Sequence, residues 1–192
     1  MRVSKQKSAE HRQQIVQAAA RLFKEHGIGA TGVDSITREA SLTHGAVYSQ
    51  FGSKEAIATD ALRLALRDSK QTWLRMASKK GHKKALPAIV ASYLSARHRD
   101  APGSGCVVAA LGGEISRQPD AVRDAFTDEF TRAADFLAEL ISSDDSSITR
   151  DDALASFASM AGGLMLARAV NDPALSDRIL KATAAWINRK AK

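Results

Sequence analysis

Apolar side chains recur at spacings of three and four along almost the whole chain, and no other feature constrains its fold as strongly. From Ile15 to His26 they occupy positions i, i+3, i+4, i+7, i+8 and i+11, which form one stripe on a helix. No segment of several residues alternates between apolar and polar side chains as a half-buried strand would. The pattern therefore predicts an all-α fold of about nine to ten helices.

Positive charge is concentrated in the first half of the 192-residue chain. Residues 1–100 hold eighteen Lys and Arg against eight Asp and Glu, whereas residues 101–192 hold ten against thirteen. Clustered basic side chains raise the local concentration of anions, so we expect a polyanion to meet the first half. Nucleic acid is the leading candidate and an anionic membrane surface the second, although the lysine pairs at 79–80 and 83–84 could simply solvate helix ends.

The sequence lacks the features of several protein classes. No apolar run approaches the ~20 residues that span a bilayer, and the N-terminus lacks the apolar core of a secretory signal. Cys106 is the only cysteine, which excludes an intrachain disulfide framework. Neither a metal-ligand spacing, a Gly-rich phosphate loop nor a nucleophile motif is recognisable. We therefore expect a cytoplasmic protein that is not an enzyme, with no metal, cofactor or membrane partner.

Residues 8–55 indicate a compact unit of three helices. Gly27 ends the first helix, because glycine adopts a left-handed backbone at little cost. A short second helix follows, with Val33, Ile36 and Ala40 on its inner face. This arrangement supplies the first half of a helix-turn-helix.

The third helix completes that motif. It follows a turn at Ser41 and Leu42 and begins after Thr43, a suitable N-cap. Val47 and Phe51 lie four residues apart and are expected to pin it to the first two helices. Two helices joined by such a turn and braced by a third can seat a recognition helix in the major groove of DNA.

The outward positions of this unit suit DNA. Small residues near the helix start allow close backbone approach, and the free N–H groups there suit a phosphate. A glutamine can read adenine bidentately, while hydroxyl and ammonium groups suit phosphates. The candidate DNA-binding residues are Thr31, Thr43, His44, Gly45, Ala46, Tyr48, Ser49, Gln50 and Lys54.

Several of these spacings occur together in a known family. The segments Ala18-Ala19-x-x-Leu22-Phe23-x-x-x-Gly27, Ala30-Thr31-x-Val33-x-x-Ile36 and Gly45-x-x-Tyr48-x-x-Phe51-x-Ser53-Lys54-Glu55 closely resemble the TetR family of transcriptional regulators. The resemblance implies a helix-turn-helix DNA-binding domain over residues 1–53 and a helical effector-binding and dimerisation domain over residues 54–192. It also implies a homodimer on a palindromic double-stranded operator, controlled by a small molecule.

Two positions depart from the family pattern. Ser41 stands where the family usually has glycine, so we expect a left-handed turn strained by ~1–2 kcal/mol. Gly32 stands where a serine or threonine often caps the second helix. Neither change removes a DNA-contacting group.

Breaker and cap residues divide the second half into further helices. We expect loops at residues 97–105 and 142–147 and a helix start at Cys106. Thr149 with Asp152 three residues later approximates a capping box for one of two long amphipathic helices.

The two long amphipathic helices favour a four-helix dimer interface. Their stripes alone would equally close the core of one chain, so it is the family resemblance that favours dimerisation. The candidate interface residues are Phe130, Leu137, Phe157, Ala161, Gly162 and Leu164.

Large and adaptable side chains provide candidates for an effector pocket, which we expect to take a small, partly apolar molecule. The candidate pocket residues are Trp73, Met76, Tyr93, Cys106, Leu111, Phe126, Met160 and Met165. Cys106 also follows a Gly-Ser-Gly sequence at a helix start, where the helix dipole lowers a thiol's pKa.

The sequence thus predicts a homodimeric repressor that occludes a promoter and is released from its operator by a small-molecule effector. Two alternatives remain open: a redox or electrophile sensor acting through Cys106, and a helical ligand carrier without DNA binding.

Overall fold

The computed structural model describes residues 5–80, 85–142 and 149–190. These residues form ten α-helices and one 3-10 helix, without a strand, which confirms the all-α prediction. The helices are α1 Lys5–His26, α2 Val33–Glu39, α3 His44–Phe51, α4 Lys54–Lys80, α5 Ala85–Tyr93, α6 Ala96–Asp100, α7 Val107–Ile115, α8 Asp120–Ser142, α9 Arg150–Ala169 and α10 Pro173–Lys190, with the 3-10 helix η2 at Pro102–Ser104.

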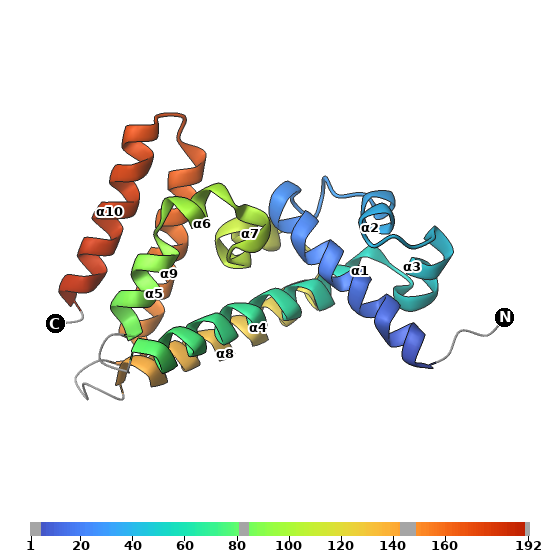
Figure 1. The fold of residues 1–192 in the computed structure, drawn as a ribbon, viewed down its shortest axis with the longest axis horizontal. Helices are drawn as coiled ribbons and strands as arrows, with labels where there is room; N and C mark the ends of the chain where they lie inside the picture. The colour runs from blue at the N-terminus through green and yellow to red at the C-terminus, as the bar shows by residue number, and fades with distance from the viewer. Residues whose placement is uncertain (1–4, 81–84, 143–148, 191–192) are drawn as a thin grey trace.

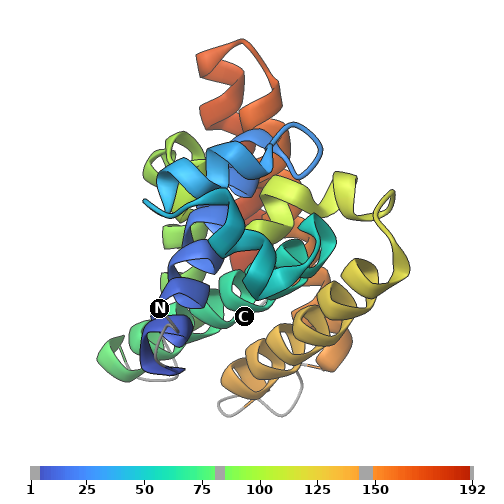
Figure 2. The same cartoon turned by 90° about the vertical axis from the view of Figure 1, so that its right-hand side faces the viewer.

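The helices form an elongated molecule with two distinct ends. In Figure 1, α1, α2 and α3 lie at one end and α5, α9 and α10 at the other. Helices α4 and α8 run side by side between them, as the rotated view in Figure 2 also shows. No helix in the described ranges is both long and apolar enough to cross a membrane.

The local signals in the sequence act as expected. Gly27 ends α1 with φ at 87°, and the Thr43 side chain accepts a hydrogen bond from the N–H of Ala46 at the start of α3. Thr149 and Asp152 form a complete capping box at α9. Ser41 adopts φ of 55°, the left-handed backbone predicted for the turn.

The expected loop at residues 97–105 is wrong for most of its length. Residues 96–100 form α6, whose first turn is capped by the Ser95 hydroxyl accepting from the N–H of His98 at 3.2 Å. Pro102 then opens η2. Serine and proline act here as helix-start residues rather than as breakers. Residues 143–147 of the other expected loop and the lysine pair at 83–84 lie outside the described residues.

Two hydrophobic cores share the chain. One holds α9 and α10 against α5, α8 and the far half of α4. The other joins α1, α2 and α3 to Ile57, Leu62 and Leu66 of α4 and to Val107 and Leu111 of α7. The core of the N-terminal unit thus extends beyond residue 53, and the domain boundary there stays a prediction.

A carboxylate from α7 connects these parts. Glu114 accepts hydrogen bonds from the N–H of Ile28 at 2.9 Å and from the N–H of Gly29 at 2.5 Å, just beyond the end of α1. A Cβ added at Gly27 would lie only 2.8 Å from Glu114 Oε2. Glycine is therefore required at residue 27 by its left-handed backbone and by the space that the carboxylate occupies.

Removing this carboxylate should destabilise the protein. In Glu114→Ala, the N–H groups of Ile28 and Gly29 lose their acceptor, so the free energy of unfolding is expected to fall by about 1–3 kcal/mol in urea denaturation. Glu139→Ala, at an exposed position on α8, is the control and should change stability by less than ~0.5 kcal/mol. Equal losses in the two variants would contradict this role for Glu114.

Candidate functional site

Helix α3 lies at one end of the molecule (Figure 1), and its outer side chains form a small polar surface. Val47 is buried on its inner side, while His44, Gly45, Tyr48 and Ser49 are exposed. The first N–H groups of α3 point toward its N-terminus, where His44 and Gly45 lie, and the Thr43 side chain accepts the one of Ala46. The predicted recognition helix therefore has an accessible outer face.

Neighbouring groups orient the side chains on this face. His44 Nε2 lies 2.7 Å from Asp34 Oδ1, and the rings of His44 and Tyr48 lie 5.1 Å apart. The Ser49 hydroxyl donates to the carbonyl of Ala46 at 2.9 Å. Tyr48 is 48% exposed. Its hydroxyl is thus well placed to reach a phosphate.

Three other predicted DNA-binding residues are engaged within the protein. Thr31 is only 2% exposed and donates to the carbonyl of Gly27 at 2.7 Å. Gln50 donates from Nε2 to the Ser8 hydroxyl at 2.7 Å. Lys54 Nζ donates to the carbonyl of Gly29 at 3.3 Å, and Ala46 is half-buried. The structure thus does not bring Thr31 and Gln50 to the exposed face, because each side chain has a partner inside the unit.

Arg12 positions the recognition helix, a role that the sequence did not reveal. Its guanidinium donates to the carbonyl of Gln50 at 2.8 Å and pairs with Asp60 at 2.5 Å. The same group lies 4.1 Å from the centre of the Phe51 ring. Arg12 therefore joins α1 to the end of α3 and to α4. Its partners are 38 or more residues away, so no local pattern could identify it.

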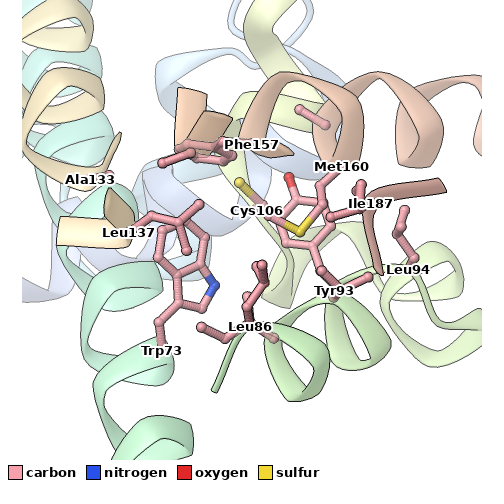
Figure 3. Close-up of a cluster of buried hydrophobic side chains, with 14 of the residues drawn as sticks. Trp73, Leu86, Tyr93, Leu94, Cys106, Ala133, Leu137, Phe157, Met160 and Ile187 are labelled. Atoms are coloured by element: carbon pink, nitrogen blue, oxygen red, sulfur yellow. The ribbon is translucent and has the colours of Figure 1, made fainter. Parts of the chain in front are cut away.

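A cavity of about 590 Å³ lies between α1, α4, α5, α6 and the segment from Gly103 to Cys106. This volume is within the range of small-molecule sites. Four of the predicted pocket residues line it: Trp73, Met76, Tyr93 and Cys106. Figure 3 shows Trp73, Tyr93 and Cys106 in the neighbouring hydrophobic cluster.

The other four predicted pocket residues lie elsewhere. Leu111 is in the core of the N-terminal unit, and Phe126 stacks on Phe130 with ring centres 5.8 Å apart. Met160 is fully buried in the core that α9 and α10 form with α5 and α8, whereas Met165 is 46% exposed. These four residues therefore do not line this cavity, because helical spacing shows that a side chain is on an apolar face, but not what that face contacts.

His98, which sequence reasoning missed, organises the cavity wall. Its Nδ1 lies 2.7 Å from the carbonyl of Tyr93, and its Nε2 accepts from the N–H of Cys106 at 2.8 Å. The second bond requires an unprotonated Nε2, so the ring is the neutral tautomer with hydrogen on Nδ1. Burial lowers the pKa of His98, which favours this neutral form.

Cys106 is the N-cap of α7 and is 4% exposed. It is also one of the residues that line the cavity. Within the described part of the chain, no group of three His, Cys, Asp or Glu is arranged to hold a metal ion.

Most predicted dimer-interface residues belong to the core of one chain. Leu137, Phe157, Leu164 and Ala161 are buried there, and Phe130 stacks on Phe157 at 5.0 Å between ring centres. This corrects the prediction, because side chains already packed within one chain are not available to a second. Gly162 is half-buried, and a Cβ there would meet nothing within 4 Å.

A different set of apolar side chains is exposed on the last two helices. Leu154, Met165 and Leu166 lie on α9, and Leu175 and Trp186 lie on α10. Together with Ala158 and Gly162, the three α9 side chains follow one helical face. We call these seven residues the α9/α10 face.

The N-terminal geometry defines a class of protein. A short capped helix with an exposed polar face, seated on two supporting helices, is the arrangement of a helix-turn-helix DNA-binding protein.

Two family models match the chain. Residues 15–61 match bacterial regulatory proteins of the tetR family, and residues 83–183 match the tetracyclin repressor-like C-terminal domain. The chain therefore belongs to the TetR family of transcriptional regulators, which bind DNA and are not enzymes. Family membership excludes the alternative of a carrier without DNA binding.

Individual relatives agree with this assignment. The chain is 34% identical over 64 residues to the HTH-type transcriptional regulator AcrR of Shigella flexneri, covering 33% of this chain and 30% of AcrR. It is 28% identical over 114 residues to the HTH-type transcriptional repressor DhaR of Mycobacterium sp. strain GP1, covering 58% and 56% of the two chains. The matches thus span only part of these curated relatives.

The fold recurs in solved structures. A TetR-family regulator from Cytophaga hutchinsonii matches with a TM-score of 0.79 at 22% identity, over 98% of this chain and 97% of the other. At this level of identity the likeness shows a shared fold.

Gly45 provides a test of the α3 surface. A Cβ there meets nothing within 4 Å, so Gly45→Ala should fold as stably as the wild type or up to about 1 kcal/mol more stably. If DNA packs against this position, the added methyl group should weaken operator binding about tenfold. Fluorescence anisotropy with a labelled operator and thermal unfolding measure the two effects.

Gly113→Ala is the matched control, because Gly113 lies on α7 with equally open space around a Cβ. It should leave operator affinity unchanged. If Gly45→Ala retains wild-type affinity, then DNA does not approach the backbone at Gly45.

Proposed function

We propose that this protein is a homodimeric repressor whose α3 helices read the two halves of a palindromic operator. The observation that carries this proposal is the exposed face of α3, where His44, Gly45, Tyr48 and Ser49 surround a capped helix start. A bound dimer would block polymerase at a promoter. The relative DhaR is named a transcriptional repressor, which supports repression rather than activation here.

The cavity supports control by an effector. It is lined by α1 of the DNA-binding unit and by α4, α5, α6 and the segment from Gly103 to Cys106, so a ligand inside it would touch both parts of the chain. A ligand that binds one separation of the two α3 helices more tightly would shift the population toward that separation. The effector would release the operator when the favoured separation no longer matches the two half-sites.

Selection of genomic DNA fragments followed by footprinting tests the proposed function. We expect a protected palindrome that overlaps a promoter, with affinity falling roughly a thousandfold or more between about 50 and 200 mM salt as phosphate contacts are lost. Retention of fragments without sequence preference would contradict operator recognition. A protected site upstream of the promoter, together with increased transcription, would contradict repression.

The α9/α10 face is the proposed dimer interface. Leu166 is 52% exposed, and the small residues Ala158 and Gly162 on the same face permit close approach of a second helix. Two copies of α9 and α10 would form a four-helix bundle that covers the exposed leucines and Trp186. Pairing at this end also leaves both α3 helices free, because they lie at the opposite end of each chain (Figure 1).

A charge on the α9/α10 face should separate the two chains. Leu166→Asp would bury an unpaired carboxylate in the interface, so sedimentation at micromolar concentration should show a monomer where the wild type shows a dimer. Leu74→Asp is the matched control, because Leu74 is similarly exposed but lies on α4. A dimer that persists in Leu166→Asp, or that is lost equally in Leu74→Asp, would contradict this interface.

A further inference from the structure

The wall of the cavity contains a cation supplied by the DNA-binding unit. Lys24, from the last turn of α1, lines the cavity and donates from Nζ to the carbonyl of Gly105 at 3.2 Å. An ammonium group has three donors, so this bond leaves two available. Burial lowers the pKa of Lys24, and the nearby carboxylates of Asp68 and Glu25 act in the opposite direction.

Two polar atoms beside the cavity are buried and have no hydrogen-bond partner among the described residues. They are the Tyr93 hydroxyl, which lies beside Cys106, and Arg168 Nη1. Arg168 lies directly behind the wall, since its other nitrogens donate to the carbonyls of Arg99 at 3.0 Å and His98 at 2.7 Å. A buried donor without an acceptor costs free energy, so an acceptor group that reached this side of the wall would be stabilised.

The charge of the lining is also positive on balance. Lys24 and Arg97 line the cavity, and Asp68 is the one carboxylate among the described lining residues. Asp68 is exposed to solvent, whereas Lys24 is partly buried. An anion would therefore find its strongest partner at the Lys24 side of the cavity.

Part of the wall is apolar and partly aromatic, and hydroxyl groups of Ser69, Thr72, Ser92, Ser95 and Ser104 line the remainder. Trp73, Met76 and Ile89 line the cavity, and Trp73 is held edge-on against Phe157 with ring centres 5.1 Å apart. A flat apolar ring would gain contact with the indole and the thioether.

We propose that the cavity binds a small aromatic carboxylate, with its ring against Trp73, Met76 and Ile89 and its carboxylate on Lys24. This assigns a ligand class to the effector site and rests on the proposed function for its regulatory consequence. The carboxylate binds the two N–H groups of Lys24 that the carbonyl of Gly105 leaves available. Ligand binding thereby acts on the side chain that connects α1 directly to the Gly105 segment of the regulatory part.

Calorimetric titration of the full-length protein without DNA tests the ligand class. Benzoate and cinnamate are compared at neutral pH with benzamide, cinnamamide and benzylamine, which have similar shapes but no negative charge. The better-binding acid is expected to bind about tenfold or more tightly than its own amide, and benzylamine more weakly than either. Equal affinity of acid and amide, tighter binding of benzylamine, or no binding of either acid would overturn the proposal.

Three variants locate the charge that selects the acid. Lys24→Met should remove the preference for acid over amide, whereas Lys24→Arg should retain it. Lys181→Met, which removes an exposed lysine on α10, should also retain it. If Lys24→Met still prefers the acid over the amide, the assignment of the carboxylate to Lys24 is overturned. If Lys24→Met does not fold, the acid and amide affinities of the wild type and of Lys24→Arg still test the ligand class.

Adding the better-binding acid to the protein–operator complex tests the regulatory consequence. We expect the acid to release the operator from the wild type. We expect no such release from Lys24→Met. A wild-type protein that fails to bind any operator would contradict the proposed function, whereas the titration without DNA would still decide the ligand class.

Discussion

The carboxylate of Glu114 connects the DNA-binding unit to the regulatory part of the chain. It accepts the N–H groups of Ile28 and Gly29, which follow the end of α1, and it comes from α7 on the regulatory side. Helix α7 also buries Val107 and Leu111 in the core of the N-terminal unit. A displacement of α7 therefore has to move α1 or break these hydrogen bonds.

The connection continues from α1 to the recognition helix. Arg12 joins α1 to the carbonyl of Gln50 at the end of α3 and to Asp60 on α4. These contacts hold the inner side of α3, so that its outer side chains can remain exposed. The position of α3 is thus set by contacts with α1 and α4 as well as by its own short sequence.

Buried polar groups distinguish the cavity from the surrounding core. In the core next to it, Phe157 and Leu137 are fully buried among apolar side chains. In the cavity wall, His98 uses both ring nitrogens to connect Tyr93 with Cys106. Hydrogen bonds therefore connect this wall on the His98 side, while Lys24 has N–H groups that a ligand can use.

The sequence by itself determined the all-α fold, the helix-turn-helix and the helix starts at Thr43 and Thr149. These features depend on residues within about four positions of one another, where helical spacing and capping operate. Only the tertiary structure decided that Gln50 points inward and that the apolar stripe at Phe157 closes the core of one chain. It also revealed Glu114 and Lys24, whose partners are 81 or more residues away. Contacts at such separations depend on how whole helices pack, and the local pattern of side chains does not predict that packing.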